Sequence, residues 1–250
     1  MQGCEESDLA TARYDINVHV AIGSQPFASS KLVSFAPAVV LCNASNAIMH
    51  VQQYHSSKLL TLKPGQSRPL ILFNPDAKPE LLVQPVCEGV QWNWSGRFTV
   101  SEVSSHALRI HSTNDPSHFT ILPISVSMQV RSVCAPDFSQ ICNFRNIASE
   151  LWVQGYSLVC VFNSTKLQHA PYQIENACSN YVVCIRQKDS PEWSREKDFF
   201  KIMPNDRTRL PFAWDDTIAP HKLGFILLPK GMLSRILMRC HLCAMCSLHR

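Results

Sequence analysis

Alternation of apolar and polar residues is the dominant pattern along the chain. In segment 124–130 every second residue is apolar, namely Ile124, Val126, Met128 and Val130. A period of two predicts a strand with one buried face. Runs rich in β-branched and aromatic residues predict further strands at 39–41, 81–83, 98–101, 106–111, 157–162 and 181–185. Turn-forming residues separate these runs. The pattern predicts an all-β fold of the sandwich type.

Two segments of the chain share one order of motifs, and they begin at Val39 and Pro171. Each copy has the order strand, Asn-containing turn, strand, polar spacer, strand, Pro turn and strand. The aligned pairs include Asn43 with Asn176, Gln53 with Gln187, Leu62 with Ile202, and Phe73 with Trp214. Such a repeat predicts tandem β-sandwich modules. The second module is shorter, and we expect it to be incomplete.

These patterns divide the chain into four parts. The first part is polar and turn-rich, and it is either a loop or the remnant of a preceding element. Two short apolar runs, 225–228 and 232–238, predict a short amphipathic helix near the end of the chain. The expected parts are residues 1–31, a β-sandwich module at 32–170, a second and truncated β module at 171–228, and a basic Cys-rich tail at 229–250.

The recurring asparagine has a physical role available to it. An Asn between two strands adopts left-handed backbone geometry at low cost, and its amide offers two donors and two acceptor lone pairs. At the corner of a module it can satisfy backbone groups where the strand ladder breaks. We therefore predict that Asn43 and Asn176 organise the modules and their partner-binding surface, and that Trp214 is a core aromatic of the second module.

Composition and charge change this interpretation little. The chain is 46% hydrophobic with a formal net charge of +4. No acidic residue follows Asp216, so the last part is basic and can contact an anionic membrane or nucleic acid, although a solvated surface is favoured. The 11 cysteines lack the spacing of a disulfide framework. The first residues lack an apolar leader and no run is long enough to span a bilayer. We expect a reducing compartment.

Candidate chemical sites are weak. Cys240, Cys243, Cys246 and His249 offer zinc-ligand chemistry, but four ligands within ten residues strain a tetrahedron, so an oxidation-prone tail is favoured. Asp215 and Asp216 are adjacent, and neighbours on a strand face opposite ways, so a turn is favoured over a catalytic pair. Cys178 or Cys184 with His169 has no activating group. We expect no catalysis, no cofactor and no small-molecule substrate.

Two motifs carry a family resemblance. PYQIENACSNYVVCIRQ, followed by IMPNDRTRLPFAWDD, resembles the adaptor-binding region of the vacuolar protein sorting-associated protein 13 family, the bridge-like intermembrane lipid transfer proteins. The first copy, with VQWNWSGRFTV after it, is similar to the preceding repeat of that region. The resemblance covers about residues 32–228. Each family repeat carries an Asn near its start, which Asn43 and Asn176 match.

The resemblance implies a non-catalytic fragment or short splice product made of repeated β modules. Such a region binds Pro-containing peptides of organelle adaptor proteins. It would place the chain in the cytoplasm, peripherally and indirectly on Golgi, endosomal or other organelle membranes, in lipid and protein transport at membrane contact sites. Nothing in this chain matches the family's lipid groove, and neither nucleic acid nor a small molecule is an expected partner.

Two other functional classes stay open at this point. An extracellular-type carbohydrate- or protein-binding sandwich would use Trp92 and Trp94 as a sugar platform, and it would need export and disulfides. Core positions are favoured for these two rings. A hydrolase is the third class, and the sequence has no motif for it.

Overall fold

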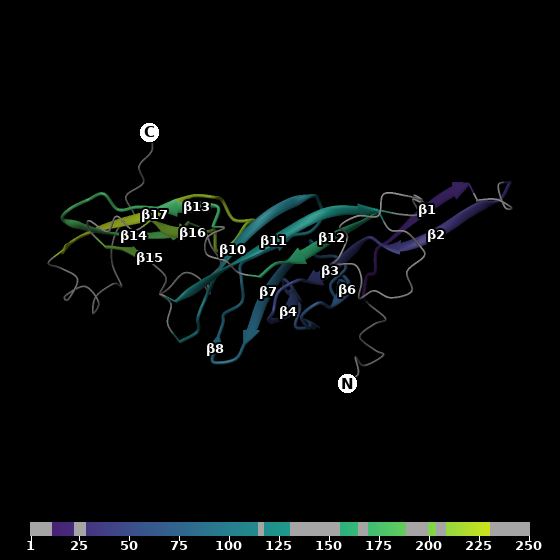
Figure 1. Ribbon diagram of the computed structural model, residues 1–250, viewed down its shortest axis with the longest axis horizontal. Helices are drawn as coiled ribbons and strands as arrows, with labels where there is room; N and C mark the ends of the chain where they lie inside the picture. Colours follow the sequence, from purple (N-terminus) through teal and green to yellow (C-terminus); the bar gives the residue numbers. More distant parts are fainter. Residues whose placement is uncertain are drawn as a thin grey trace.

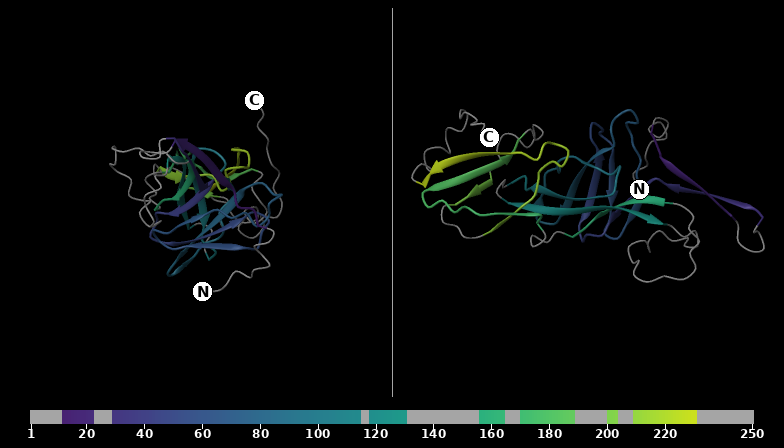
Figure 2. Two further views of the ribbon diagram at one scale, coloured as in Figure 1. Left: turned by 90° about the vertical axis from the view of Figure 1, so that its right-hand side faces the viewer. Right: turned by 90° about the horizontal axis from the view of Figure 1, so that it is seen from above.

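The protein is described by a computed structural model, which covers residues 12–22, 29–114, 118–130, 156–164, 170–188, 200–203 and 209–230. The named regular elements of this part are all β-strands, which confirms the all-β prediction. Figures 1 and 2 show an elongated molecule: the ribbon β1–β2 lies at one end, the first β module in the middle and the second at the opposite end.

The first module consists of two sheets. One sheet has the strand order β10-β11-β12-β3-β6, and the other has the order β5-β4-β7-β8 with β9 also paired to β7. The strands of the first sheet are β3 (Val39–Asn43), β6 (Ser67–Pro69), β10 (Ser104–His111), β11 (Phe119–Val130) and β12 (Tyr156–Phe162). Those of the second are β4 (Ile48–Gln53), β5 (Leu59–Leu62), β7 (Glu80–Cys87), β8 (Val90–Gln91) and β9 (Phe98–Thr99).

One hydrophobic core joins these two sheets. It includes Leu41, Val83, Phe98, Ile124 and Phe162, all of which are buried. The rings of Phe98 and Phe162 meet edge to face with centroids 6.1 Å apart. Alternation explains this core, because every second side chain of a strand points to the same face.

The second module repeats the first five strands of this arrangement. Its two strand groups are β13-β16 and β15-β14-β17, which match β3-β6 and β5-β4-β7. Its core contains Ile185, Ile202 and Phe212. The bounds are β13 (Tyr172–Ile174), β14 (Tyr181–Gln187), β15 (Phe200–Ile202), β16 (Leu210–Phe212) and β17 (Leu223–Pro229).

The two modules also share strand register. In the first module Met49 pairs with Leu62 on β5 and with Pro85 on β7. In the second module Val183 pairs with Ile202 on β15 and with Leu227 on β17. These pairings follow the alignment of Leu62 with Ile202. The repeat in the sequence is therefore a repeat in topology.

Two expectations near the ends need revision. The apolar run at 225–228 predicts part of a short helix, but these residues lie in the strand β17, where Phe225 pairs with Ile185. A short apolar run is compatible with a helix or a strand, and here hydrogen bonding to β14 stabilises the strand. Residues 231–250, with the second run of that helix, lie outside the described residues.

The first part of the chain contains a strand where the sequence favours a loop or the remnant of a preceding element. β1 (Ile16–Ile22) pairs along its whole length with β2 (Lys31–Pro37) in a two-stranded antiparallel ribbon. The ribbon runs directly into β3 and contacts the body near β12, where the Asn17 side chain donates to the Tyr156 carbonyl at 2.6 Å. Among the described residues no helix is long and apolar enough to cross a membrane.

Burial separates the five cysteines of the described residues into two groups, which predicts their reactivity. Cys160 lies in the core, where burial raises the pKa of its thiol and neighbouring Cys42 adds to the shift, whereas Cys87 and Cys178 are exposed. Because the thiolate is the reactive form, N-ethylmaleimide should modify Cys87 and Cys178 in the native protein well before Cys160, which should react only after unfolding in urea. Mass spectrometry of peptides would show this order, and equally fast labelling of Cys160 and Cys87 would contradict the described core.

Candidate functional site

Asn43 closes the corner between β3 and β4. Its side chain is fully buried. The amide nitrogen donates to the carbonyls of Ala47 at 2.7 Å and Leu62 at 3.0 Å. The amide oxygen accepts from the backbone N–H of Ser45 at 3.0 Å and from its hydroxyl at 2.7 Å. One side chain thus joins the turn after β3 to the end of β5.

Asn176 makes the corresponding bonds in the second module. Its amide nitrogen donates to the carbonyls of Tyr181 at 2.9 Å, Ile202 at 2.9 Å and Met203 at 3.0 Å. Its amide oxygen accepts from the backbone N–H of Cys178 at 3.0 Å. Like Asn43, it bonds the N–H two residues ahead and a carbonyl at the end of the third strand of its copy. The two asparagines therefore occupy equivalent corners.

A second repeated amide lies at the end of the next strand. In the first module Gln53 exchanges two hydrogen bonds with the backbone of Asn74, at 2.7 and 2.9 Å. In the second, the Gln187 oxygen accepts from the backbone N–H groups of Asp215 and Asp216 at 2.9 and 3.0 Å, and its nitrogen donates to the Asp216 carbonyl at 2.7 Å. The sequence alignment matches Gln53 with Gln187, but their hydrogen-bond partners could not be predicted from the sequence and are seen only in the structure.

Trp214 lies where the two modules meet. Its half-buried ring packs against Phe212 with centroids 5.4 Å apart and stacks on His221 at 4.7 Å. Its backbone carbonyl accepts from the N–H of Arg109 on β10 at 2.9 Å, next to a bridge between Leu108 and Trp214. The predicted aromatic of the second module thus contacts the second core and a strand of the first module.

A buried ion pair follows directly after Trp214. The Arg109 guanidinium on β10 donates two parallel hydrogen bonds to the Asp215 carboxylate, at 2.7 and 2.8 Å. The two residues are 1% and 3% exposed. The Arg109 guanidinium also lies 4.9 Å from the Phe212 ring centroid, and His111 approaches the same carboxylate at 3.3 Å. The pair joins the first module to the second.

The electrostatics of this pair keep Asp215 ionised. Burial alone would raise the pKa of its carboxyl group, because a low-dielectric interior disfavours charge. The opposite charge of Arg109 and the hydrogen bonds from His111 and Arg109 outweigh burial and hold the pKa of Asp215 well below its usual range. The pair is therefore charged at neutral pH.

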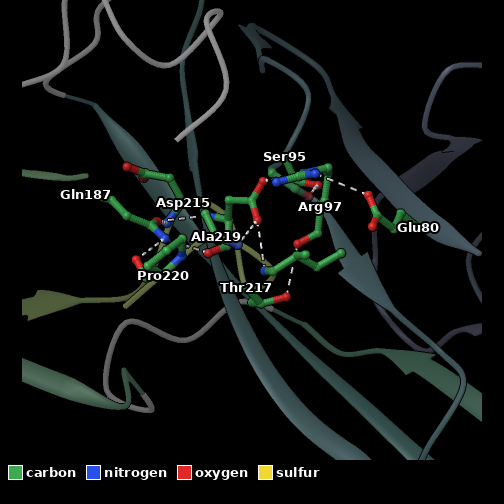
Figure 3. A network of polar contacts seen from close by, with 11 residues as sticks. Glu80, Ser95, Arg97, Gln187, Asp215, Thr217, Ala219 and Pro220 are labelled. Atoms are coloured by element: carbon green, nitrogen blue, oxygen red, sulfur yellow. Dashed lines mark hydrogen bonds and ion pairs between the residues drawn. The ribbon is translucent and has the colours of Figure 1, made fainter. Parts of the chain in front are cut away.

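A second ion pair extends the junction (Figure 3). The Arg97 side chain donates to the Asp216 carboxylate at 2.9 Å and to Glu80 at 3.2 Å. The other carboxylate oxygen of Asp216 accepts from the backbone N–H groups of Ile218 and Ala219, both at 2.8 Å. Figure 3 shows Gln187 on one side of this segment and Arg97 with Glu80 on the other.

Gly96 allows the two backbones to come this close. A Cβ at position 96 would lie 1.9 Å from the carbonyl oxygen of Asp215 and 2.5 Å from the Cα of Asp216. No side chain fits there without moving backbone. The neighbouring Ser95 hydroxyl accepts from the N–H of Val83 on β7 at 2.9 Å and so anchors this loop to the first module.

Other residues singled out from the sequence are placed as follows. Trp92 is buried in the first core, so it does not present the exposed ring face that a sugar platform needs, and Trp94 is half-buried. Cys178 is exposed and Cys184 is buried. His169, Cys240, Cys243, Cys246 and His249 lie outside the described ranges. Within those ranges no group of His, Cys, Asp or Glu side chains is arranged to hold a metal ion.

Comparison with known proteins identifies the family to which this chain belongs. The family model described as vacuolar-sorting associated protein 13, adaptor binding domain, matches residues 5–134. The chain belongs to the vacuolar protein sorting-associated protein 13 family. The match includes the ribbon β1–β2 and most of the first module, and it ends before the second copy, whose motif carries the more specific resemblance.

Two relatives in the family are intermembrane lipid transfer proteins. Vps13A of Dictyostelium discoideum is 23% identical over 180 residues, which is 71% of this chain and 4% of that protein. VPS13 of Chaetomium thermophilum is 22% identical over 219 residues, which is 86% of this chain and 6% of that protein. This chain thus spans a small fraction of the length of its relatives.

The buried pair at the junction predicts a specific pattern of stabilities. Replacing Asp215 with Leu leaves Arg109 buried without its counter-charge, and should lower the free energy of unfolding by about 3–5 kcal/mol. The double replacement Arg109→Leu and Asp215→Leu should cost less than the sum of the single ones, since it removes both charges. Urea unfolding measures all three. Arg13→Ala, at the exposed pair with Asp15, is the control and should change little. Additive costs would contradict coupling across the junction.

The close backbone contact at Gly96 predicts a separate effect. Gly96→Ala should destabilise the protein by about 1–3 kcal/mol or more, because the added methyl group forces the backbones apart. Gly224→Ala is the matched control, since its new Cβ would lie 3.7 Å from the nearest atom, an ordinary contact. Thermal unfolding of both variants compares them, and equal midpoints would show that the two modules are not packed as described.

Proposed function

We propose that this chain is a non-catalytic, adaptor-binding region that recruits a lipid-transfer protein of its family to organelle membranes. It would act in the cytoplasm, bound indirectly to Golgi, endosomal or other organelle membranes through membrane-resident adaptors. The partners would be short Pro-containing peptides of those adaptors. The observation that carries the proposal is the match of residues 5–134 to the family's adaptor binding domain.

The repeated corner supports a particular docking mode. In both modules the Asn amide bonds a carbonyl at the end of a sheet-edge strand, which is Leu62 of β5 in the first module and Ile202 of β15 in the second. Among the described residues β5 pairs only with β4, and β15 only with β14. An edge strand offers backbone groups to an extended peptide. The asparagines would thus shape the edge on which the peptide binds.

Proline in the ligand is compatible with this mode. A peptide added at a sheet edge has one row of N–H groups that face away from the sheet, and proline, which lacks an N–H, fits at those positions without losing a ladder bond. Main-chain bonds would give affinity, and side chains of the edge such as Met203, which is exposed, would contribute selectivity. Of the two asparagines, Asn176 would affect this edge more, because its amide bonds the carbonyls of both Ile202 and Met203.

A peptide-binding assay tests the proposal. Fluorescence anisotropy with labelled Pro-x-Pro peptides from organelle adaptor proteins should show saturable binding to the wild-type chain, and weaker binding when the prolines are replaced by alanine. Asn176→Ala should weaken binding about tenfold or more, because it removes bonds worth about 1 kcal/mol each to the edge strand. Circular dichroism confirms that the variant is folded at the assay temperature.

Asn93→Ala is the matched control, since Asn93 has an exposed side chain in the first module, and it should bind like the wild type. Failure of the whole peptide panel to bind the wild-type chain would reject the adaptor-binding proposal. Normal binding by a folded Asn176→Ala variant would reject the role of the asparagine alone.

A further inference from the structure

The described part of the second module carries an excess of positive charge at its surface. Its acidic side chains are Glu175, Asp215 and Asp216. The two aspartates are buried and paired with arginines of the first module, and Glu175 lies 3.6 Å from Arg209. Every acidic side chain in this part of the module is therefore already paired with an arginine. The other Lys and Arg residues of this part are Arg186, Lys188, Lys201, Lys222 and Lys230.

Strand register places these cations on one face of the sheet β15-β14-β17. Arg186 pairs with Gly224, and Cys184, two residues before Arg186 on β14, pairs with Lys201. Paired residues of neighbouring strands share a face, as do residues two apart in one strand. A Cβ on Gly224 would lie 3.7 Å from the Lys188 Cγ and 3.9 Å from the Arg186 Cγ. The side chains of Arg186, Lys188 and Lys201 therefore lie on the same face.

The same face continues beyond both ends of the β14–β17 pair. The backbone N–H of Lys188 donates to the Lys222 carbonyl at 2.8 Å, and the backbone N–H of Lys230 donates to the Asn180 carbonyl at 2.9 Å. These bonds extend the ladder by one residue at each end, so Lys222 and Lys230 follow the same alternation. We call Arg186, Lys188, Lys201, Lys222 and Lys230 the basic face.

The basic face is turned away from the core of its module. Ile185 and Ile202, at the alternate positions of β14 and β15, belong to that core. Ile226 and Leu228 of β17 share the basic face by register, and both are half-buried. Along β17 an apolar strip thus has a lysine at each end. The exposed lysines of the basic face are Lys201, Lys222 and Lys230.

We infer that the basic face binds directly to the surface of a bilayer that contains anionic phospholipids. Each lysine or arginine near such a surface adds to the attraction, and the face presents its cations together on one sheet with aliphatic side chains between them. Single-stranded nucleic acid is the less suitable partner, because its bases stack on aromatic rings and the described residues of this face include none. The contact would add to the indirect recruitment by adaptors, and it does not depend on the proposed peptide binding.

Co-sedimentation of the full chain with lipid vesicles tests this inference. The wild type should bind vesicles of phosphatidylcholine with about one third phosphatidylserine and should not bind vesicles of phosphatidylcholine alone. Because salt screens charge, about 1 M NaCl should abolish binding. The triple variant Lys188→Gln, Lys222→Gln and Lys230→Gln should have a partition coefficient lower by about fivefold for each lysine lost. Circular dichroism confirms that the variant is folded.

The matched control removes the same charge elsewhere, by replacing three exposed lysines outside the basic face, and it should bind vesicles like the wild type. An equal loss in this control would show that only net charge matters, and would overturn the inference. Failure of the wild type to bind anionic vesicles would also overturn it. So would a triple variant that loses binding to a single-stranded oligonucleotide but keeps vesicle binding. The control positions are Lys31, Lys63 and Lys78.

This test is separate from that of the proposed function. The vesicles contain no adaptor, so their binding does not require a peptide site. The triple variant leaves β15 and Asn176 unchanged, and it should bind Pro-x-Pro peptides like the wild type. Loss of vesicle binding with normal peptide binding therefore concerns the basic face alone.

Discussion

A buried guanidinium–carboxylate pair determines how the two β modules are joined. Arg109 and Asp215 are withdrawn from water, and removing charges from water is costly unless their geometry and hydrogen bonding compensate. Here two short parallel bonds and a neighbouring histidine provide that compensation. The carboxylate is positioned because Gln187 holds the backbone of Asp215 and Asp216, and Gly96 leaves room for that backbone. Displacing one module relative to the other would break both of these bonds and separate the two charges.

The repeated amides explain how one architecture is built twice from different side chains. Most core residues change between the copies, but the corner asparagine and the strand-end glutamine keep their partners. These side chains replace backbone hydrogen bonds that are lost where strands end. In the second copy the segment held by glutamine gains two aspartates, and through them a junction. The glutamine bonds, which both copies of the repeat have, therefore also position the two aspartates that bind the first module.

Much of the fold follows from local pattern, and the junction does not. Period-two alternation and the aligned asparagines predict the strands and the repeat, because side-chain direction in a strand depends only on neighbouring residues. Arg109 and Asp215 are 106 residues apart, and two adjacent aspartates favour a turn without indicating which side chains they contact. The need for glycine at position 96 cannot be predicted from local sequence either, because it comes from the backbone of Asp215 and Asp216, far away in the chain. The run at 225–228 misleads because a short apolar run fits a helix or a strand.

The central claim is that the junction makes the two modules a single cooperative unit. Native-state hydrogen exchange of the wild-type chain in increasing urea tests it most directly, by comparing backbone amides in the middle of β4 with those in the middle of β14. The account predicts that both sets exchange through one opening reaction, with the same free energy and the same urea dependence. A lower opening free energy for β14, independent of that for β4, would contradict it.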